Sequence, residues 1–213
     1  MGLLLGLLGG GIGGAIGAAI WAVIAYTTGF EVGWIAWGVG VLAGVGMAIG
    51  ARDDTSMLTG ILAAVIALGS VLAGKYIAIT YMVNDHIPTS SLTTITDEDI
   101  LVHIADQLVE EYQQAGKPLA WPVGMTVEEA TTEADYPKNL WADMLTRWKA
   151  LSPDEIEQRR AFLTQESTQS LAQFKSMVAE DAFTESFSLF DALWFFLAVG
   201  SAYKIGSGEG EGE

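Results

Sequence analysis

Two ionisable residues lie inside otherwise apolar stretches, where a charge needs a partner or a purpose. Lys75 belongs to the apolar run 57–82, and Asp191 lies near the start of the apolar run that follows residue 186. If both runs cross a membrane, the two side chains lie at similar depth and can form an intramembrane ion pair. We expect the pair to fix the register of two helices, or Lys75 to extend toward the membrane surface. A role in handling protons or ions is the less favoured alternative.

Glu31 is a further candidate, because it lies in the short polar turn 27–33 between two apolar runs. An acidic side chain at this point can accept hydrogen bonds from the free amides of the next helix, and this capping role is the one we expect. The alternative is a ring of carboxylates at the mouth of a symmetric pore.

Only His103 of the two histidines has acidic residues at helical spacing. Asp99, His103 and Asp106 share one face of a predicted helix, and Glu110 follows one turn later. Structural zinc sites usually have four ligands dominated by Cys or His, and the chain contains no cysteine. We therefore expect a solvent-exposed polar face and no metal site.

No catalytic motif accompanies these residues. G-x-S-x-G, H-E-x-x-H, the P-loop and the dinucleotide-binding fingerprint are absent from the sequence. The glycine run 9–14 lies within an apolar stretch without a neighbouring lysine, so helix packing explains it better than phosphate binding. The sequence predicts a protein that is not an enzyme and uses no cofactor.

Charge and hydrophobicity are segregated along the 213 residues, of which 51% are hydrophobic although the net charge is −16. Residues 1–83 carry only Glu31, Arg52, Asp53, Asp54 and Lys75, whereas residues 84–185 carry 19 acidic and 7 basic side chains. This acidic balance disfavours nucleic acid as a partner. The absence of cysteine excludes disulfides.

These patterns predict an all-α polytopic membrane protein with four transmembrane helices and a small helical extramembrane domain between the third and fourth. We expect a membrane domain in residues 1–83, with helices at about 5–26, 34–51 and 57–82, because a span needs roughly 20 apolar residues. The acidic domain then occupies 84–185, the fourth transmembrane helix 186–205, and a flexible acidic tail 206–213.

Small residues recur every fourth position in the first three spans, which allows close helix packing in a membrane. The first helix has the rows Gly2, Gly6, Gly10, Gly14, Ala18, Ala22 and Gly9, Gly13, Gly17; the second has Ala36, Gly40, Gly44, Ala48; the third has Ala63, Ala67, Ser70, Gly74, Ala78. Two rows on one helix exceed what a single neighbour needs. We expect the surplus face of the first helix to contact another chain.

The orientation prediction depends on Arg52 and Lys204, which fall on the same side if all four segments cross. Positively charged residues prefer the cytoplasmic side, so we expect cytoplasmic termini and an extracytoplasmic domain 84–185.

Capping residues and apolar stripes predict helices in the acidic domain. Thr96 is predicted to cap a helix that stops at Gly116, and Thr126 to start a short helix. A third apolar stripe spans 140–148. Ser152 opens a long helix that we expect to continue unbroken into the fourth span, because no proline or glycine intervenes before Gly200.

Three segments carry a resemblance. The run 9–19 looks like a glycine zipper, and the hairpin 29–40 (G-F-E-V-G-W-I-A-W-G-V-G) and the closing segment 190–204 resemble uncharacterised bacterial multi-span membrane proteins. The resemblance implies a bacterial membrane protein and carries no activity with it.

The function predicted from the sequence is that of a non-enzymatic protein of the inner (plasma) membrane. It contacts membrane lipids and either oligomerises or serves as an accessory or scaffold subunit of a larger membrane protein complex through small-residue packing. The alternative is a component of a homo-oligomeric channel or transporter, which the scarcity of polar residues in the spans disfavours.

Overall fold

The computed structural model describes residues 1–29, 33–88 and 94–209, and all regular structure in these ranges is helical. The elements are α1 (Gly2–Thr28), α2 (Gly33–Ala51), the 3₁₀ turn η1 (Arg52–Asp54), α3 (Met57–His86), α4 (Asp97–Gln114), the 3₁₀ turn η3 (Glu133–Asp135), α5 (Lys138–Ala150), α6 (Pro153–Glu185) and α7 (Leu189–Gly206). The chain divides into two compact units, one of residues 1–87 with 174–213 and the other of residues 88–173.

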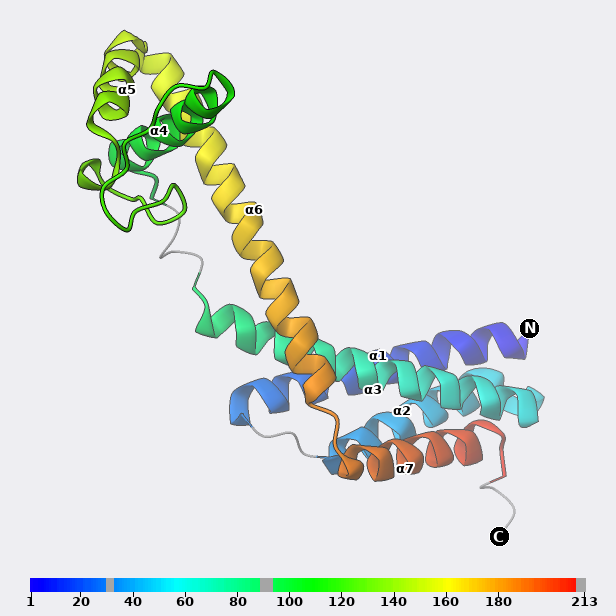
Figure 1. Ribbon diagram of the computed structural model, residues 1–213. Coiled ribbons are helices and arrows are strands. Elements are labelled where there is room, and N and C mark those ends of the chain that lie inside the picture. The colour runs from blue at the N-terminus through cyan, green and yellow to red at the C-terminus, as the bar shows by residue number, and fades with distance from the viewer. Residues whose placement is uncertain (30–32, 89–93, 210–213) are drawn as a thin grey trace. The chain divides into compact units, whose positions relative to one another are not determined.

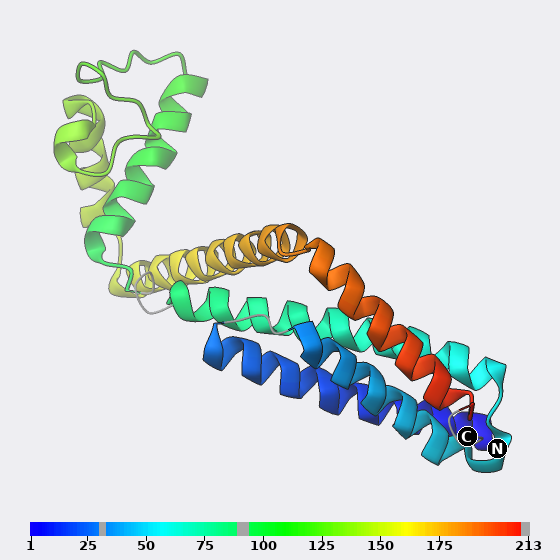
Figure 2. The ribbon, with the colours of Figure 1, turned by 90° about the horizontal axis from the view of Figure 1, so that it is seen from below.

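Four helices of the first unit are long and apolar enough to cross a membrane: α1, the segment of α2 and η1, α3 and α7. They lie side by side in both views, α1 and α7 each against both α2 and α3 (Figures 1 and 2). Contacts between Gly9 and Gly46 and between Gly13 and Leu42 make α1 antiparallel to α2. The pairs Gly40–Ala198 and Gly44–Ala202 make α7 parallel to α2.

This bundle has small residues inside and large apolar residues outside. Its buried positions are mostly alanine and glycine, with Trp21 and Met47 as the largest apolar side chains among them. The outward-facing side chains are large and aliphatic or aromatic: Leu4, Leu8, Ile12, Ile16, Ile20, Ile49, Val65, Phe190 and Phe196. Such a surface is costly in water and suits a hydrocarbon environment.

The start of α1 and the end of α7 lie at the same end of the bundle. The amide of Gly2 donates to Asp54 Oδ2 at 3.1 Å, so α1 starts at the turn between α2 and α3. The buried hydroxyl of Thr59 donates to the carbonyl of Gly206 at 2.7 Å, so α7 ends beside the start of α3. Arg52 and Lys204 therefore belong to the same end of the bundle.

Both glycine rows of α1 are covered within the chain. A methyl group added at Gly9 or Gly13 would overlap the carbonyl oxygen of Gly46 or Leu42 on α2. The other row faces both neighbours. A methyl group added at Gly10 would meet Ala43 and Met47 of α2 and Ile66 of α3, and one added at Gly14 would meet Ile66 and Ser70 of α3. Both rows of α1 therefore have close neighbours in its own bundle, and the expectation that another face of this helix contacts another chain stays a prediction.

The remaining predicted packing glycines have similar roles. Gly2 and Gly6 lie against Asp54 and Met47, and Gly17 lies against Val39. Gly40 and Gly44 of α2 receive α7, whose own row Ala198, Ala202, Gly206 the sequence reading missed. The fourth helix thus also carries small residues at four-residue spacing, and it uses them for the same purpose.

The second unit has its own hydrophobic core. Ile100, Ile104 and Leu108 of α4 pack against Leu140 and Met144 of α5. The same buried cluster contains Leu163 of α6, Tyr136 and Trp141. The predicted cap is present, since Thr96 Oγ1 accepts from the Asp99 amide and the Asp99 side chain accepts from the Thr96 amide.

Two sequence expectations about helices in this part of the chain are wrong. Residues 126–130 form a single turn, closed by the Ala130 amide on the Thr126 carbonyl, and no α-helix begins there. The long helix does not continue into the fourth span: α6 ends at Glu185, and α7 begins at Leu189. The fourth apolar helix therefore starts three residues later than the predicted 186.

Candidate functional site

The two charged side chains buried in the bundle come together where α6 ends and α7 begins. Lys75 of α3 is 1% exposed and Asp191 of α7 is 9% exposed. Lys75 Nζ lies 3.3 Å from Asp191 Oδ2. The same ammonium donates to the carbonyl oxygen of Ser186 at 2.8 Å and lies 4.8 Å from the centre of the Phe187 ring.

The break between the helices has a local cause that is visible in the sequence. Ser188-Leu189-Phe190-Asp191 is a capping box: Asp191 Oδ2 accepts from the Ser188 amide at 2.7 Å, and Ser188 Oγ accepts from the Asp191 amide at 3.3 Å. The box starts a new helix at residue 189 even though no proline or glycine precedes it. The pattern of a serine followed three residues later by an aspartate was the signal that the sequence reading missed.

Asp191 Oδ2 consequently has two tasks, because it caps α7 and is the counterion of Lys75. Lys75 also binds the end of α6, where the Ser186 amide donates to the Ala182 carbonyl. A cation at a helix C-terminus interacts favourably with the free carbonyls and the helix dipole. One ammonium group therefore joins α3 to the end of α6 and the start of α7.

Aromatic rings surround this junction. Phe183 and Phe187 meet edge to face at 5.0 Å between ring centres, and Tyr76 contacts Phe183 in the same way at 5.5 Å. Phe187 also contacts Phe195 of α7 at 6.1 Å. The rings exclude water from the ion pair, which strengthens its attraction and raises the cost of breaking it.

The position of Lys75 along α3 fits the edge of a hydrocarbon layer. Lys75 is 18 positions after Met57, so it lies about 27 Å along the helix from its start. A hydrocarbon core is about 30 Å thick. The side chain nevertheless ends on protein groups, so the geometry fits helix registration better than extension toward the membrane surface.

The other residues singled out in the sequence do not join this site. Glu31 lies outside the described residues. His103 is on α4, with its Nε2 3.1 Å from Gln107 Nε2 and its ring 6.3 Å from Phe162. The part of the chain that the structure describes contains no group of three His, Asp or Glu side chains placed to hold a metal ion.

Asp106 has a different role from the solvated one expected of its helix face. Its Oδ1 accepts from the hydroxyl of the buried Tyr136 at 2.6 Å. Burial raises the pKa of Asp106, against the opposing effect of the Tyr136 hydrogen bond. The pKa of Tyr136 is also raised, first by burial and then by the bond to the carboxylate.

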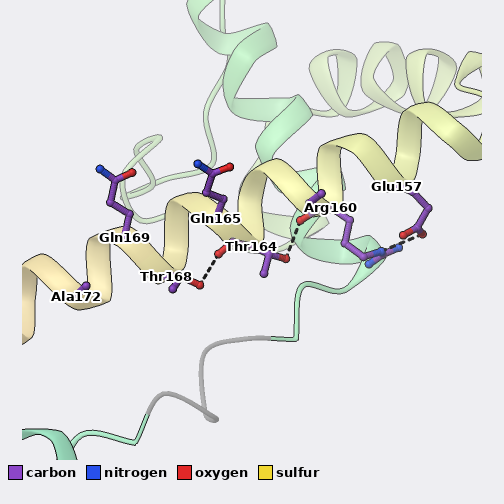
Figure 3. Close-up of a pocket in the computed structure, with 8 residues that line it drawn as sticks. Glu157, Arg160, Thr164, Gln165, Thr168, Gln169 and Ala172 are labelled. Carbon is purple, nitrogen blue, oxygen red and sulfur yellow. Dashed lines mark hydrogen bonds and ion pairs between the residues drawn. The ribbon is translucent and has the colours of Figure 1, made fainter.

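Figure 3 shows a shallow concavity along α6 in the second unit, lined by residues of one helix face. The hydroxyls of Thr168 and Thr164 donate to the carbonyls of Thr164 and Arg160, each at 2.7 Å (Figure 3). Arg160 also pairs with Glu157 at 3.2 Å (Figure 3). These groups already have partners within their own helix, so the concavity offers no converging set for catalysis.

No known protein family, curated protein or solved structure matches this chain. The arrangement itself must therefore support any functional conclusion. An ammonium enclosed by a carboxylate, a carbonyl and a ring has no open side for a reacting molecule, which makes the junction suited to holding helices together.

Proposed function

We propose that this chain is a non-enzymatic integral membrane protein with four transmembrane helices, and that it acts as an accessory or scaffold subunit of a membrane protein complex or of a homo-oligomer. The observation that carries the proposal is the inverted pattern of the bundle, with small residues inside and large apolar residues outside. In this reading, α1, α2, α3 and α7 cross the bilayer, and the unit 88–173 is the extramembrane domain that contacts partners.

The packing within the bundle changes which surfaces are available to a partner. The rows on α1 are covered by α2 and α3, so contacts with another chain use the large outward side chains or the acidic unit instead. A scaffold role also suits the junction at Lys75, because a buried, fully surrounded ion pair fixes geometry and performs no turnover.

The channel or transporter reading has less support. The only charged residues buried in the described part of the bundle are Lys75 and Asp191, and they bind each other. A solute pathway through one copy would need more polar lining. Ion or solute flux through liposomes that contain the purified protein tests this alternative, and a scaffold produces no flux above that of empty liposomes.

Membrane topology can be tested cleanly because the natural sequence contains no cysteine. Single cysteines at Asp53 and Ala115, both exposed, are labelled with a membrane-impermeant maleimide in intact and lysed bacterial cells. We expect Ala115→Cys to react in intact cells and Asp53→Cys to react only after lysis. Reaction of both cysteines in intact cells would show that α3 does not cross the membrane, and the opposite pattern would reverse the orientation.

The accessory role is tested by the mass of the protein extracted from its membrane in a mild detergent. The chain alone has a mass of 22.6 kDa. We expect a larger particle after subtraction of bound detergent and lipid. A monomer with no bound protein would refute both the oligomer and the accessory subunit.

A further inference from the structure

The turn between α2 and α3 contains one residue in a backbone conformation that does not suit it. Arg52 has a φ of 52°, in the left-handed region, where the Cβ atom of any residue other than glycine is crowded by its own backbone. At every other position with positive φ in the described ranges the chain has glycine: Gly29, Gly116, Gly124 and Gly208. Within those ranges, Arg52 is thus the single exception.

Three of these glycines follow the end of a helix, as Arg52 does. Gly29 follows α1, Gly116 follows α4, and Gly208 follows α7. Glycine is the usual residue at such a position, because it has no Cβ atom. Arg52 directly follows Ala51, the last residue of α2, so glycine is the residue that the backbone of this turn favours as well.

The side chain of Arg52 does not offset this cost by contacts within the molecule. It is exposed, and within residues 1–29, 33–88 and 94–209 its guanidinium makes no hydrogen bond or ion pair. The neighbours of Arg52 hold the turn in place, since Asp54 accepts from the Gly2 amide at 3.1 Å and Ser56 caps α3. Arg52 itself contributes its backbone carbonyl, which accepts from the Thr55 amide at 3.3 Å. Glycine would supply the same bond.

The property of Arg52 that acts without a contact inside the protein is its charge. Residues 52–56 are the short connection between two helices that are long and apolar enough to cross a membrane. Arginine and lysine in short loops set the orientation of such helices, and the anionic lipids of the cytoplasmic leaflet attract them. Acidic residues contribute little to this preference, so Asp53 and Asp54 do not cancel it.

We propose that Arg52 fixes the orientation of the bundle by holding the α2–α3 turn against the anionic headgroups of the cytoplasmic leaflet. The chain keeps a charge there, at a position where glycine would give a more stable fold. The proposal rests on the proposed membrane function and deepens it, since it names the residue and the lipid chemistry that decide which way the four helices cross.

Lys204 is the other basic side chain at this end of the bundle, and its backbone position is an ordinary one. It lies in the last turn of α7, where a cation interacts favourably with the helix dipole. Its own helix therefore accounts for Lys204 without a role in orientation. Arg52 is the residue that we expect to decide the orientation when the two are tested separately.

The first test measures orientation in intact bacterial cells with the Ala115→Cys reporter and an impermeant maleimide, relative to lysed cells. All proteins carry Lys204→Gln, so Arg52 is the one arginine or lysine left at this end of the bundle. We expect nearly complete labelling with Arg52 or Arg52→Lys. Labelling should fall to about half with Arg52→Gly or Arg52→Gln, because no positive charge then favours one orientation. Complete labelling in Arg52→Gly, or a loss of labelling already in Lys204→Gln alone, overturns the proposal.

The second test measures the cost of the conformation by reversible unfolding in detergent micelles, where the protein has no orientation to maintain. Arg52→Gly should lower the equilibrium constant of unfolding by about two- to fivefold, because glycine relieves the crowding of the backbone. Arg52→Lys and Arg52→Gln keep the crowded Cβ atom and should leave the constant unchanged. A lower stability of Arg52→Gly or Arg52→Gln would show that the charge supports the end of α2 through the helix dipole, and this result also overturns the proposal.

The protein with Arg52 and Lys204 intact separates this proposal from the membrane function on which it rests. If Ala115→Cys and Asp53→Cys both react in intact cells, α3 does not cross the membrane and the membrane function fails. If the two cysteines report the reverse orientation, the role of Arg52 fails and the crossing of α3 stands. If the expected orientation persists in Arg52→Gly, the role of Arg52 alone fails.

Discussion

The Lys75–Asp191 pair allows the reasoning about the junction to be tested quantitatively. Lys75→Met preserves the length of the side chain but leaves the Asp191 carboxylate buried with only the Ser188 cap. Asp191→Asn keeps an oxygen for the cap but leaves the ammonium with the Ser186 carbonyl as its main partner. Breaking a buried pair from one side costs about 3–5 kcal/mol, so we expect each single variant to lose at least about 3 kcal/mol.

The double variant Lys75→Met/Asp191→Asn should lose much less than the sum of the two single variants. It buries no unpaired charge, and its main remaining defect is the Ser186 carbonyl, which has lost its donor. Leaving such a buried group unsatisfied costs about 1–3 kcal/mol. The three values imply an interaction energy of at least about 3 kcal/mol between the two side chains.

The assay is reversible unfolding of the four proteins in mixed micelles, followed by far-ultraviolet circular dichroism at a fixed detergent ratio. Tryptophan fluorescence serves as a second probe, because coincident transitions justify the use of a two-state free energy. An interaction energy below about 0.5 kcal/mol would mean that the two side chains are energetically independent. The registration argument would then be refuted.

Further predictions concern the glycines, the acidic unit and the end of α7. Gly9→Ala places a methyl group against the Gly46 carbonyl and should destabilise the bundle by about 1–3 kcal/mol. In the control Gly11→Ala the added methyl group meets no atom within 4 Å, so the bundle should keep its stability. Thermal melting in detergent compares the two variants. Hydrogen bonds from Arg147, Thr132 and Ser152 lower the pKa values of Glu111, Asp135 and Glu155 below the ordinary 4.5, 3.8 and 4.5. The stability that these carboxylates provide is therefore complete at a pH above their ordinary pKa values and is lost as the pH falls through their lowered pKa values. Thermal melting in buffers from pH 7 to 3 should show a loss of stability below about pH 4.5. The raised pKa of Asp106 acts in the opposite direction. Thr59→Val removes the bond from the buried hydroxyl to the Gly206 carbonyl and also the acceptor of the Ser56 amide in the cap of α3, so it should cost at least about 1 kcal/mol. Thr80→Val, whose hydroxyl bonds only to its own helix, should cost less.

Much of the fold follows from patterns that are local in the sequence. Apolar length identifies the helices that became α1, α2, α3 and α7, and the capping residues Thr96 and Ser152 correctly start α4 and α6. The two failures have specific causes. At residue 188 a capping box ends one helix and begins another without a glycine or proline, and at Thr126 the same kind of signal produces only one turn because no apolar stripe follows it.

The use of the small-residue rows could not be predicted, because a four-residue period shows that close contact occurs but does not identify the neighbour. The rows of α1 turned out to face two different helices of the same chain, and α7 supplied a further row at Ala198, Ala202 and Gly206. The contacts that join Trp121 and Trp141 through Tyr136 could not be predicted from the sequence either, because the two tryptophans are 20 residues apart.

The junction at Lys75 also explains why a charge is tolerated in a bundle that is otherwise held by backbone contact. Glycine and alanine contacts bring α1, α2, α3 and α7 close together, but a four-residue repeat looks almost the same after a shift of one turn. An ion pair is satisfied in one register only, because a shift of one turn separates Nζ from Oδ2 by about 5.4 Å. Since the same Asp191 oxygen caps α7, the wrong register would also weaken the start of that helix. Packing therefore supplies the attraction between the helices, and the Lys75–Asp191 pair fixes the axial register of α3 relative to α7.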